Sequence, residues 1–171
     1  YRIYGGLSFY QRKEIKDLIA YLRLIYQPND RASFDRIVNV PTRGVGSKSI
    51  QIFNAWMNAN NYNLEQALTK VGDCQGLTNK AKKSLLELSD ILYSLRQLSE
   101  DSSISGLVES LIKRIEYIEY LDDGTIQAES RQENVRELLS VASEYEDLGL
   151  EGFLEEVALL SSNDSGDNKQ N

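Results

Sequence analysis

The sequence predicts an all-α protein, built as an irregular multi-helix bundle with one short strand at its N-terminal end. Apolar residues recur three and four positions apart along most of the chain, which is the spacing of amphipathic helices. Only the first six residues suggest a strand instead, because they end in a glycine pair. The length of 171 residues, 41% of them apolar, suits one domain that buries its own core.

The N-terminal segment, YRIYGG at 1–6, is predicted to be a strand that stops where Gly5 and Gly6 let the backbone turn. A strand without a partner is only marginally stable, so we interpret 1–6 as the junction with a larger protein. The glycine pair is then a candidate hinge. A helix follows from Ser8, and it is expected to end near Gln27 because the next residue is proline.

The remaining helices are predicted from the same periodicity, together with capping and turn residues. They are 30–39, a helix that follows Gly46 up to the NNYN segment, a short helix after an Asn63 cap through Val71, 78–98, 104–121, 130–145 and 150–160. The tail is polar and rich in small residues, which predicts a disordered linker. We therefore divide the chain into a junction at 1–6, a helical subdomain at 7–161 and a linker at 162–171.

Composition excludes several kinds of chemistry. The chain contains no histidine, so it can form neither a serine–histidine–aspartate triad nor a zinc site that uses imidazole. It also lacks the GxxxxGK[ST] phosphate loop and the GxGxxG dinucleotide pattern. We expect this chain by itself to be no enzyme and to hold no metal or cofactor. The lone cysteine, Cys74, fits a reducing cytoplasm, and neither a membrane span nor a secretion signal is indicated.

Charge is divided unevenly along the chain. Residues 1–100 carry a net charge of +5 and residues 101–171 a net charge of −12, within a total of −7. Such asymmetry hints at a nucleic-acid face in the basic half. Four carboxylates of the acidic half match no EF-hand loop and are interpreted as a solvated helix end: Glu116, Glu119, Asp122 and Asp123.

The segment NVPTRGVGSKSI at 39–50 predicts a helix-hairpin-helix, since it places two glycines in a tight turn between two helices. Glycine lets a ligand approach the backbone closely, and N–H groups at a helix start attract an anion such as phosphate. Val45 would anchor the turn in the core, while Arg43 and Lys48 would add charge and Ser47 a hydroxyl. A plain interhelical turn with solvated charges is the alternative for these residues.

A second basic segment lies at the start of the 78–98 helix. Thr78 begins this helix, and Lys80, Lys82 and Lys83 lie in its first turns. These residues are a candidate secondary DNA contact, because helix N-termini attract phosphate. The alternative is a solvated helix face, which is where runs of lysine usually occur.

Two motifs within residues 1–46 resemble the 2B subdomain of UvrD, Rep and PcrA type superfamily 1A DNA helicases. The family's YR-x-x-GG-x-x-F-x-x-R-x-EIKD stretch matches at Tyr1, Arg2, Gly5, Gly6, Phe9, Arg12 and Glu14 to Asp17. The family's N-x-P-x-RGIG hairpin matches at Asn39, Pro41 and Arg43 to Gly46, with valine in the isoleucine position. A fainter likeness to the family's R-x-EN-x-x-EL helix covers 130–146.

The resemblance implies an ATP-dependent 3′ to 5′ DNA helicase, working at the nucleoid in the bacterial cytoplasm. ATP and Mg²⁺ would bind the RecA-like motor domains, whose motifs are absent from this sequence. The 2B subdomain would swivel about Gly5 and Gly6 against those motor domains and hold duplex or forked DNA without regard to its sequence. By position, the duplex-contacting loop consists of Thr42, Arg43, Gly44, Val45, Gly46, Ser47 and Lys48.

A different function fits the negative net charge. The chain would then be a helical interaction module that binds regulatory protein partners through its acidic second half, without direct DNA binding. Titration with duplex DNA at low salt separates the two hypotheses, because contacts to phosphate weaken steeply as salt is raised.

Overall fold

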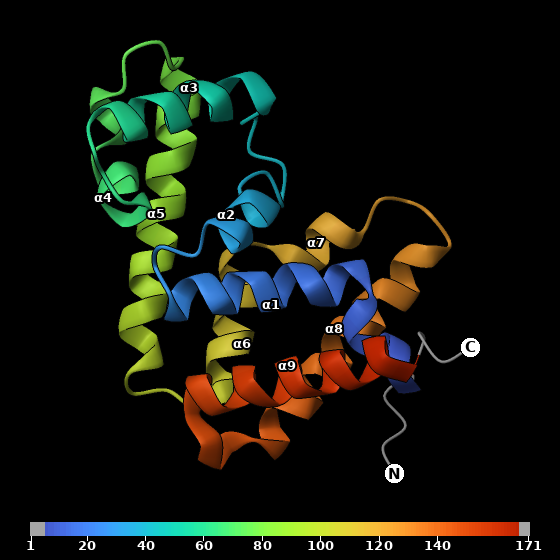
Figure 1. Cartoon of the computed structure of the whole chain (residues 1–171). Coiled ribbons are helices and arrows are strands. Elements are labelled where there is room, and N and C mark those ends of the chain that lie inside the picture. The colour runs from blue at the N-terminus through green and yellow to red at the C-terminus, as the bar shows by residue number, and fades with distance from the viewer. Residues whose placement is uncertain (1–5, 168–171) are drawn as a thin grey trace.

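The computed structural model describes the backbone of residues 6–167 and the side chains of residues 9–161. All regular secondary structure within 6–167 is helical, which confirms the all-α class (Figure 1). The strand predicted at 1–6 lies outside the described residues, except for Gly6, which begins a 3₁₀ helix. None of the helices within 6–167 is both long enough and apolar enough to cross a membrane.

Short and long helices alternate along the chain, and α1 lies at the centre of the bundle. In order they are η1 (Gly6–Gln11), α1 (Lys13–Tyr26), α2 (Arg31–Ile37), α3 (Ser47–Ala59), α4 (Leu64–Thr69), η2 (Val71–Asp73), α5 (Asn79–Ser99), α6 (Ile104–Arg114), α7 (Tyr117–Leu121), α8 (Gln127–Glu144), η3 (Glu146–Leu148) and α9 (Gly149–Asp167). Helix α1 packs against η1, α2, α5, α8 and α9. Figure 1 shows α5 reaching from α3 and α4 at one end of the molecule toward α6 at the other.

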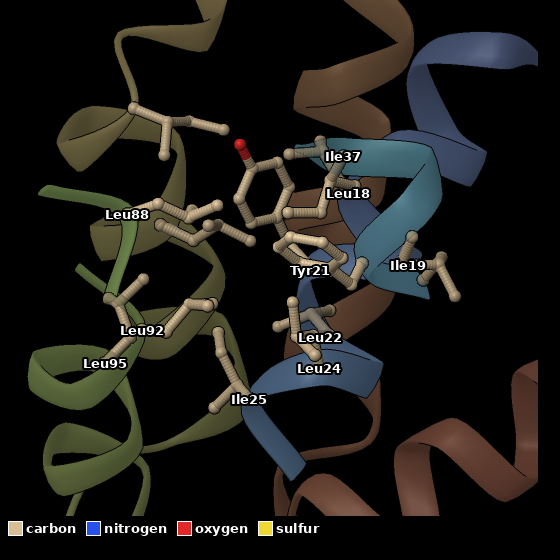
Figure 2. Close-up of a cluster of buried hydrophobic side chains, with 14 of the residues drawn as sticks. Leu18, Ile19, Tyr21, Leu22, Leu24, Ile25, Ile37, Leu88, Leu92 and Leu95 are labelled. Atoms are coloured by element: carbon tan, nitrogen blue, oxygen red, sulfur yellow. The ribbon is translucent and has the colours of Figure 1, made fainter. Parts of the chain in front are cut away.

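The core forms where α1 faces α5 (Figure 2). The facing side chains are Leu18, Tyr21, Leu22 and Ile25 of α1 with Leu88, Leu92 and Leu95 of α5, and none is more than 3% exposed. Burying an apolar side chain of this size contributes about 1.5–3 kcal/mol. The helical spacing of apolar residues is therefore the pattern that brings these two long helices together.

The helix starts predicted at Asn63 and Thr78 are observed, whereas the start predicted near Ser8 is not. The Asn63 side chain accepts a hydrogen bond from the Gln66 backbone N–H at 2.9 Å, and the Gln66 side chain accepts one from the Asn63 N–H at 3.0 Å. Thr78 caps α5 in the same way, since its hydroxyl accepts from the Ala81 N–H at 3.1 Å. Each cap satisfies a backbone donor that the first turn of a helix leaves unpaired.

The prediction of one helix over 104–121 is wrong at its centre. Helix α6 ends, Glu116 takes a left-handed φ of 52°, and α7 begins at Tyr117. The break turns Tyr117 into the core, where its hydroxyl donates to Asp17 Oδ2 at 2.9 Å. Periodicity does not reveal the break, because apolar residues continue at helical spacing on both sides of it.

Glycine in place of Glu116 should stabilise the fold by roughly 0.5–1 kcal/mol. A left-handed φ costs a side-chain-bearing residue about 1–2 kcal/mol, and glycine avoids this strain while losing more chain entropy on folding. Urea denaturation measures the change in the free energy of unfolding. The matched control is Glu109→Gly in the exposed face of α6, which should destabilise by about 1 kcal/mol. Equal losses in both variants would contradict the strain at Glu116.

Two other helix boundaries differ from the prediction. Helix α9 continues to Asp167, so 162–167 is helical where composition predicts a disordered linker. A helix that has already formed gains one hydrogen bond with each added residue, so polar composition alone does not end it. Helix α1 begins at Lys13 rather than near Ser8, because Gly6–Gln11 first forms a 3₁₀ helix.

Candidate nucleic-acid interface

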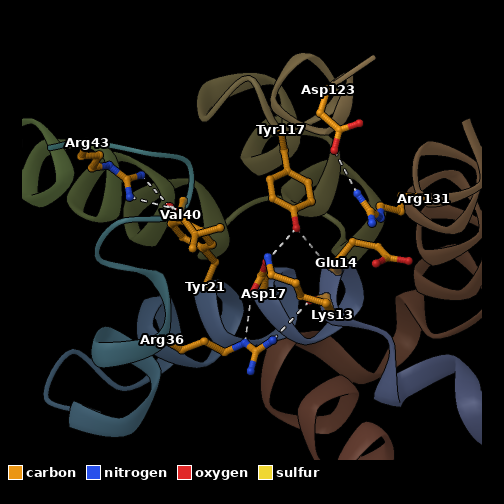
Figure 3. A network of polar contacts seen from close by, with 10 residues as sticks. All are labelled: Lys13, Glu14, Asp17, Tyr21, Arg36, Val40, Arg43, Tyr117, Asp123 and Arg131. Atoms are coloured by element: carbon orange, nitrogen blue, oxygen red, sulfur yellow. Dashed lines mark hydrogen bonds and ion pairs between the residues drawn. The ribbon is translucent and has the colours of Figure 1, made fainter. Parts of the chain in front are cut away.

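A buried carboxylate on α1 joins three helices. Asp17 is 1% exposed and accepts hydrogen bonds from Lys13 Nζ and Arg36 Nε, both at 3.0 Å, as well as from Tyr117 (Figure 3). Burial, and then the neighbouring Asp17, raises the pKa of the Tyr117 hydroxyl, so this group stays protonated and donates. Asp17 therefore ties α1 to α2 and α7.

A second polar contact joins α1 to α8. Asn134 donates from Nδ2 to Glu14 Oε1 at 2.6 Å and accepts a hydrogen bond from the Arg12 guanidinium. Glu14 and Asn134 are buried, with 6% and 8% exposure. Arg12 and Glu14 belong to the first resembling motif and Asn134 to the fainter likeness at 130–146, so these two segments meet in space. These motif residues build the framework of the domain.

The hairpin, defined here as Thr42 to Lys48, is held by one side chain at its entry. Asn39 Oδ1 accepts from the Arg43 N–H at 2.7 Å and from the Val45 N–H at 3.3 Å. Val45 is 2% exposed, as the sequence predicts for an anchor in the core. Between these two residues Gly44 takes a φ of +72°, which glycine adopts far more readily than other residues.

The Arg43 side chain points toward Tyr21 and Val40 (Figure 3). Its Nη1 donates to the carbonyls of Ile37, Val38 and Val40 at 2.9, 3.2 and 3.2 Å. Its Nη2 donates to the Tyr21 hydroxyl at 2.5 Å, and that hydroxyl in turn donates to the Val40 carbonyl. Burial raises the pKa of Tyr21 although Arg43 acts in the opposite direction. The Arg43 side chain is therefore half-buried and hydrogen-bonded within the domain.

The exposed part of the hairpin combines glycine backbone with polar side chains, among them Thr42. Gly44, Gly46, Ser47 and Lys48 are exposed. Helix α3 begins at Ser47 with Gly46 as its N-cap, and no side chain caps it, as is also the case for α1, α7 and α8. The first N–H groups of α3 are thus available to an external acceptor, together with the positive end of the helix dipole.

The start of α5 packs against the hairpin. Ser84 Oγ donates to the Arg43 carbonyl at 2.9 Å. The Lys80 side chain lies across Gly44, since a Cβ built on that glycine would be 3.1 Å from Lys80 Cε and 3.4 Å from Nζ. Two segments that the sequence predicts as separate phosphate contacts are therefore neighbours, and Lys80 is the lysine that joins them.

The sequence matches a known family over its whole length. The family described as UvrD-like helicase C-terminal domain matches residues 1–171. The chain belongs to this family.

The relatives of this UvrD-like domain carry the name of a DNA helicase. The chain is 40% identical over 175 residues to the ATP-dependent DNA helicase PcrA of Bacillus subtilis (strain 168), which matches 99% of the chain. It is 36% identical over 174 residues to the protein of the same name from Staphylococcus aureus (strain NCTC 8325 / PS 47), which matches 98% of the chain. The chain spans 24% of the length of each relative and is homologous to its C-terminal region.

The other candidate residues of the UvrD-like domain lie at the start of α5 in different surroundings. Thr78 uses its hydroxyl to cap α5, and Lys83 is exposed. Lys82 is half-buried and lies near Cys74, whose thiol is buried and has its pKa raised by that burial. The raised pKa leaves Cys74 an unreactive thiol even though a cation is close by.

The four carboxylates interpreted as a solvated helix end lie at the start of α7 and just after it: Glu116, Glu119, Asp122 and Asp123. Within the described residues, no group of three or more aspartate, glutamate, histidine or cysteine side chains is arranged to hold a metal. Asp123 instead accepts hydrogen bonds from Thr125 and pairs with Arg131 at 3.2 Å, and these contacts lower its pKa. The carboxylate of Asp123 thus stabilises the local turn through its hydrogen bonds to Thr125.

Three residues that hold the hairpin were not singled out from the sequence for this role. Asn39 could have been identified from the sequence, because it lies in the resembling hairpin motif and short polar side chains often form hydrogen bonds to nearby backbone groups. Tyr21 falls at helical spacing and gives no sign that its hydroxyl serves the hairpin. Ser84 lies 41 residues from Arg43, so its contact depends on the packing of α5.

Proposed function

We propose that this UvrD-like domain is the 2B subdomain of an ATP-dependent 3′ to 5′ DNA helicase. The subdomain binds duplex or forked DNA ahead of the fork through the backbone of the hairpin, and its swivelling modulates unwinding. The observation that carries the proposal is the exposed and uncapped start of α3 beside Gly44 and Gly46. Membership of the helicase family and the two N-terminal motifs support it.

The proposed contact is electrostatic and independent of base sequence. Backbone N–H groups at a helix start bind a phosphate oxygen, and glycine lets the DNA backbone come close to them. Lys48 and Lys80 add positive charge beside these groups, in the basic half of the chain. Contacts to phosphate position a protein on DNA but carry no base information, so binding is sequence-neutral and weakens with salt.

The proposal also assigns the rest of the chain. Residues 7–161 form the DNA-binding unit, Gly5 and Gly6 are the hinge to the motor domain, and 162–171 leads back toward that domain. ATP and Mg²⁺ bind to the motor domains of the parent protein, where hydrolysis takes place. This chain by itself is expected to turn over no ATP.

Lys48→Gln should weaken duplex binding several-fold at low salt and reduce the slope of log K against log salt by about 1. The reason is that one fewer counterion is released when one phosphate contact is lost. Fluorescence anisotropy with a labelled duplex of mixed sequence, repeated over a salt series, measures both quantities in the 171-residue chain.

The matched control is Lys113→Gln, which removes another exposed lysine from the acidic half, where it pairs with Glu109. Its affinity and salt slope should equal those of the unaltered chain. Equal effects of the two variants would contradict binding at the hairpin. If the unaltered chain binds no duplex at any salt concentration, the rival function as a protein-interaction module is favoured instead.

A further inference from the structure

We infer that Arg43 positions the hairpin for DNA without touching the DNA, and that Lys80 from α5 supplies the cationic contact at this turn. The inference rests on the proposed function, because both roles refer to a phosphate ligand at the hairpin. Arg43 holds the hairpin backbone, and Lys80 carries the charge. The fold brings these two residues together from different segments of the chain.

The Arg43 guanidinium stabilises the end of α2. Its three carbonyl acceptors, Ile37, Val38 and Val40, lie at and just beyond the last turn of that helix. The last carbonyls of a helix lack partners within the helix, and they form the negative end of its dipole. A guanidinium suits this place because it offers five donors in a rigid plane. If the Arg43 side chain turned outward toward a phosphate, these three carbonyls and the Tyr21 hydroxyl would lose the hydrogen bonds that the guanidinium donates.

The backbone of Arg43 is fixed as well as its side chain. Its N–H donates to Asn39 Oδ1 at 2.7 Å, and its carbonyl accepts from Ser84 Oγ at 2.9 Å. The following residue, Gly44, leaves this anchored position with a φ of +72°, and Val45 then enters the core. Arg43 therefore sets the direction in which the exposed backbone of the hairpin faces.

Lys80 supplies positive charge at the exposed side of the hairpin, which the Arg43 guanidinium does not reach. Its Cε and Nζ lie beside the exposed Gly44, and Lys80 is itself exposed. Its helix carries the Ser84 hydroxyl that holds the hairpin, so the ammonium and the turn are parts of one packed unit. A phosphate that approaches Gly44 would meet this ammonium directly.

Duplex binding over a salt series separates the two roles, using Arg43→Gln, Arg43→Lys and Lys80→Gln. Both Arg43 variants should bind duplex about tenfold more weakly, with an unchanged salt slope. The reason is that a hairpin without the Arg43 contacts would adopt its binding conformation only about one tenth of the time, and the affinity falls by the same factor. Lysine keeps the charge but lacks the planar fork, so it should not restore binding. Lys80→Gln should reduce the slope by about 1. Lys113→Gln, the control on α6, should change neither quantity.

Amide hydrogen exchange, measured by NMR without DNA, tests the positioning role separately. The N–H groups of Gly44, Val45 and Gly46 should exchange faster in both Arg43 variants than in the unaltered chain, while the amides of the α1 core stay protected. A reduced salt slope in Arg43→Gln, full binding by Arg43→Lys, or unchanged exchange at the hairpin would overturn the positioning role. If the unaltered chain binds no duplex, the proposed function fails, and the exchange result still decides whether Arg43 holds the hairpin.

Discussion

Replacing Asp17 with alanine is expected to lower the free energy of unfolding by about 2–4 kcal/mol. The substitution removes an acceptor shared by three donors and leaves the Tyr117 hydroxyl only its long contact of 3.4 Å to the Glu14 carbonyl. Lys13 and Arg36 limit the loss, because their side chains are 67% and 37% exposed and can regain water. Urea denaturation followed by far-ultraviolet circular dichroism measures the change.

Two further substitutions test whether the network causes the loss. Asp35→Ala removes an exposed aspartate from α2 and should change stability by no more than about 0.5 kcal/mol. Asp17→Asn should fall between the two, because its amide oxygen can still accept from Tyr117 while the charge is gone. Equal stability of Asp17→Ala and Asp35→Ala would show that the Asp17 contacts do not hold the helices together.

The motif residues of α1 support the hairpin through the framework. Asp17 and Glu14 fix α1 against α2, α7 and α8, and Tyr21 on the same helix binds the Arg43 guanidinium. The two carboxylates of the EIKD segment, Glu14 and Asp17, thus join helices. The surface proposed to meet DNA lies instead on glycine backbone and on two lysines.

The features predicted correctly from the sequence depend on nearby residues. The caps at Asn63 and Thr78 involve backbone groups three positions away, and the core stripe of α1 follows from helical spacing alone. Val45 is an apolar residue between two glycines, so its burial is the simplest way to anchor the turn. Each of these inferences needs only local geometry.

The features that were missed depend on packing between distant segments. Arg43 looks like a surface cation in the sequence, and its inward direction follows from Tyr21, which is 22 residues away. Lys80 reaches Gly44 only because α5 packs beside the hairpin. The break at Glu116 turns Tyr117 toward α1, where its hydroxyl donates to Asp17, 100 residues away in the sequence. Periodicity and local propensity contain none of this information.

Valine at position 44 is expected to destabilise the fold by about 2–3 kcal/mol, whereas valine at position 46 should change stability by no more than about 0.5 kcal/mol. Gly44 has a φ of +72°, which a β-branched residue adopts only with strain, and a new side chain would press on Lys80. Gly46 has a φ of −84° and a ψ of −176°, a conformation that valine prefers, and no atom lies within 4 Å of a built Cβ. Urea denaturation of Gly44→Val and Gly46→Val measures the difference.

Gly46→Val also separates the role of the hairpin in binding from its role in folding. The added side chain would stand at the uncapped start of α3, between the free N–H groups and an approaching phosphate. Duplex affinity should therefore fall by about tenfold, equivalent to about 1.4 kcal/mol, although the domain stays folded. Ser47→Ala, which removes only a hydroxyl beside this position, should have a smaller effect. If Gly46→Val is stable and binds duplex as tightly as the unaltered chain, DNA does not approach the backbone here, and the hairpin is only a turn between two helices.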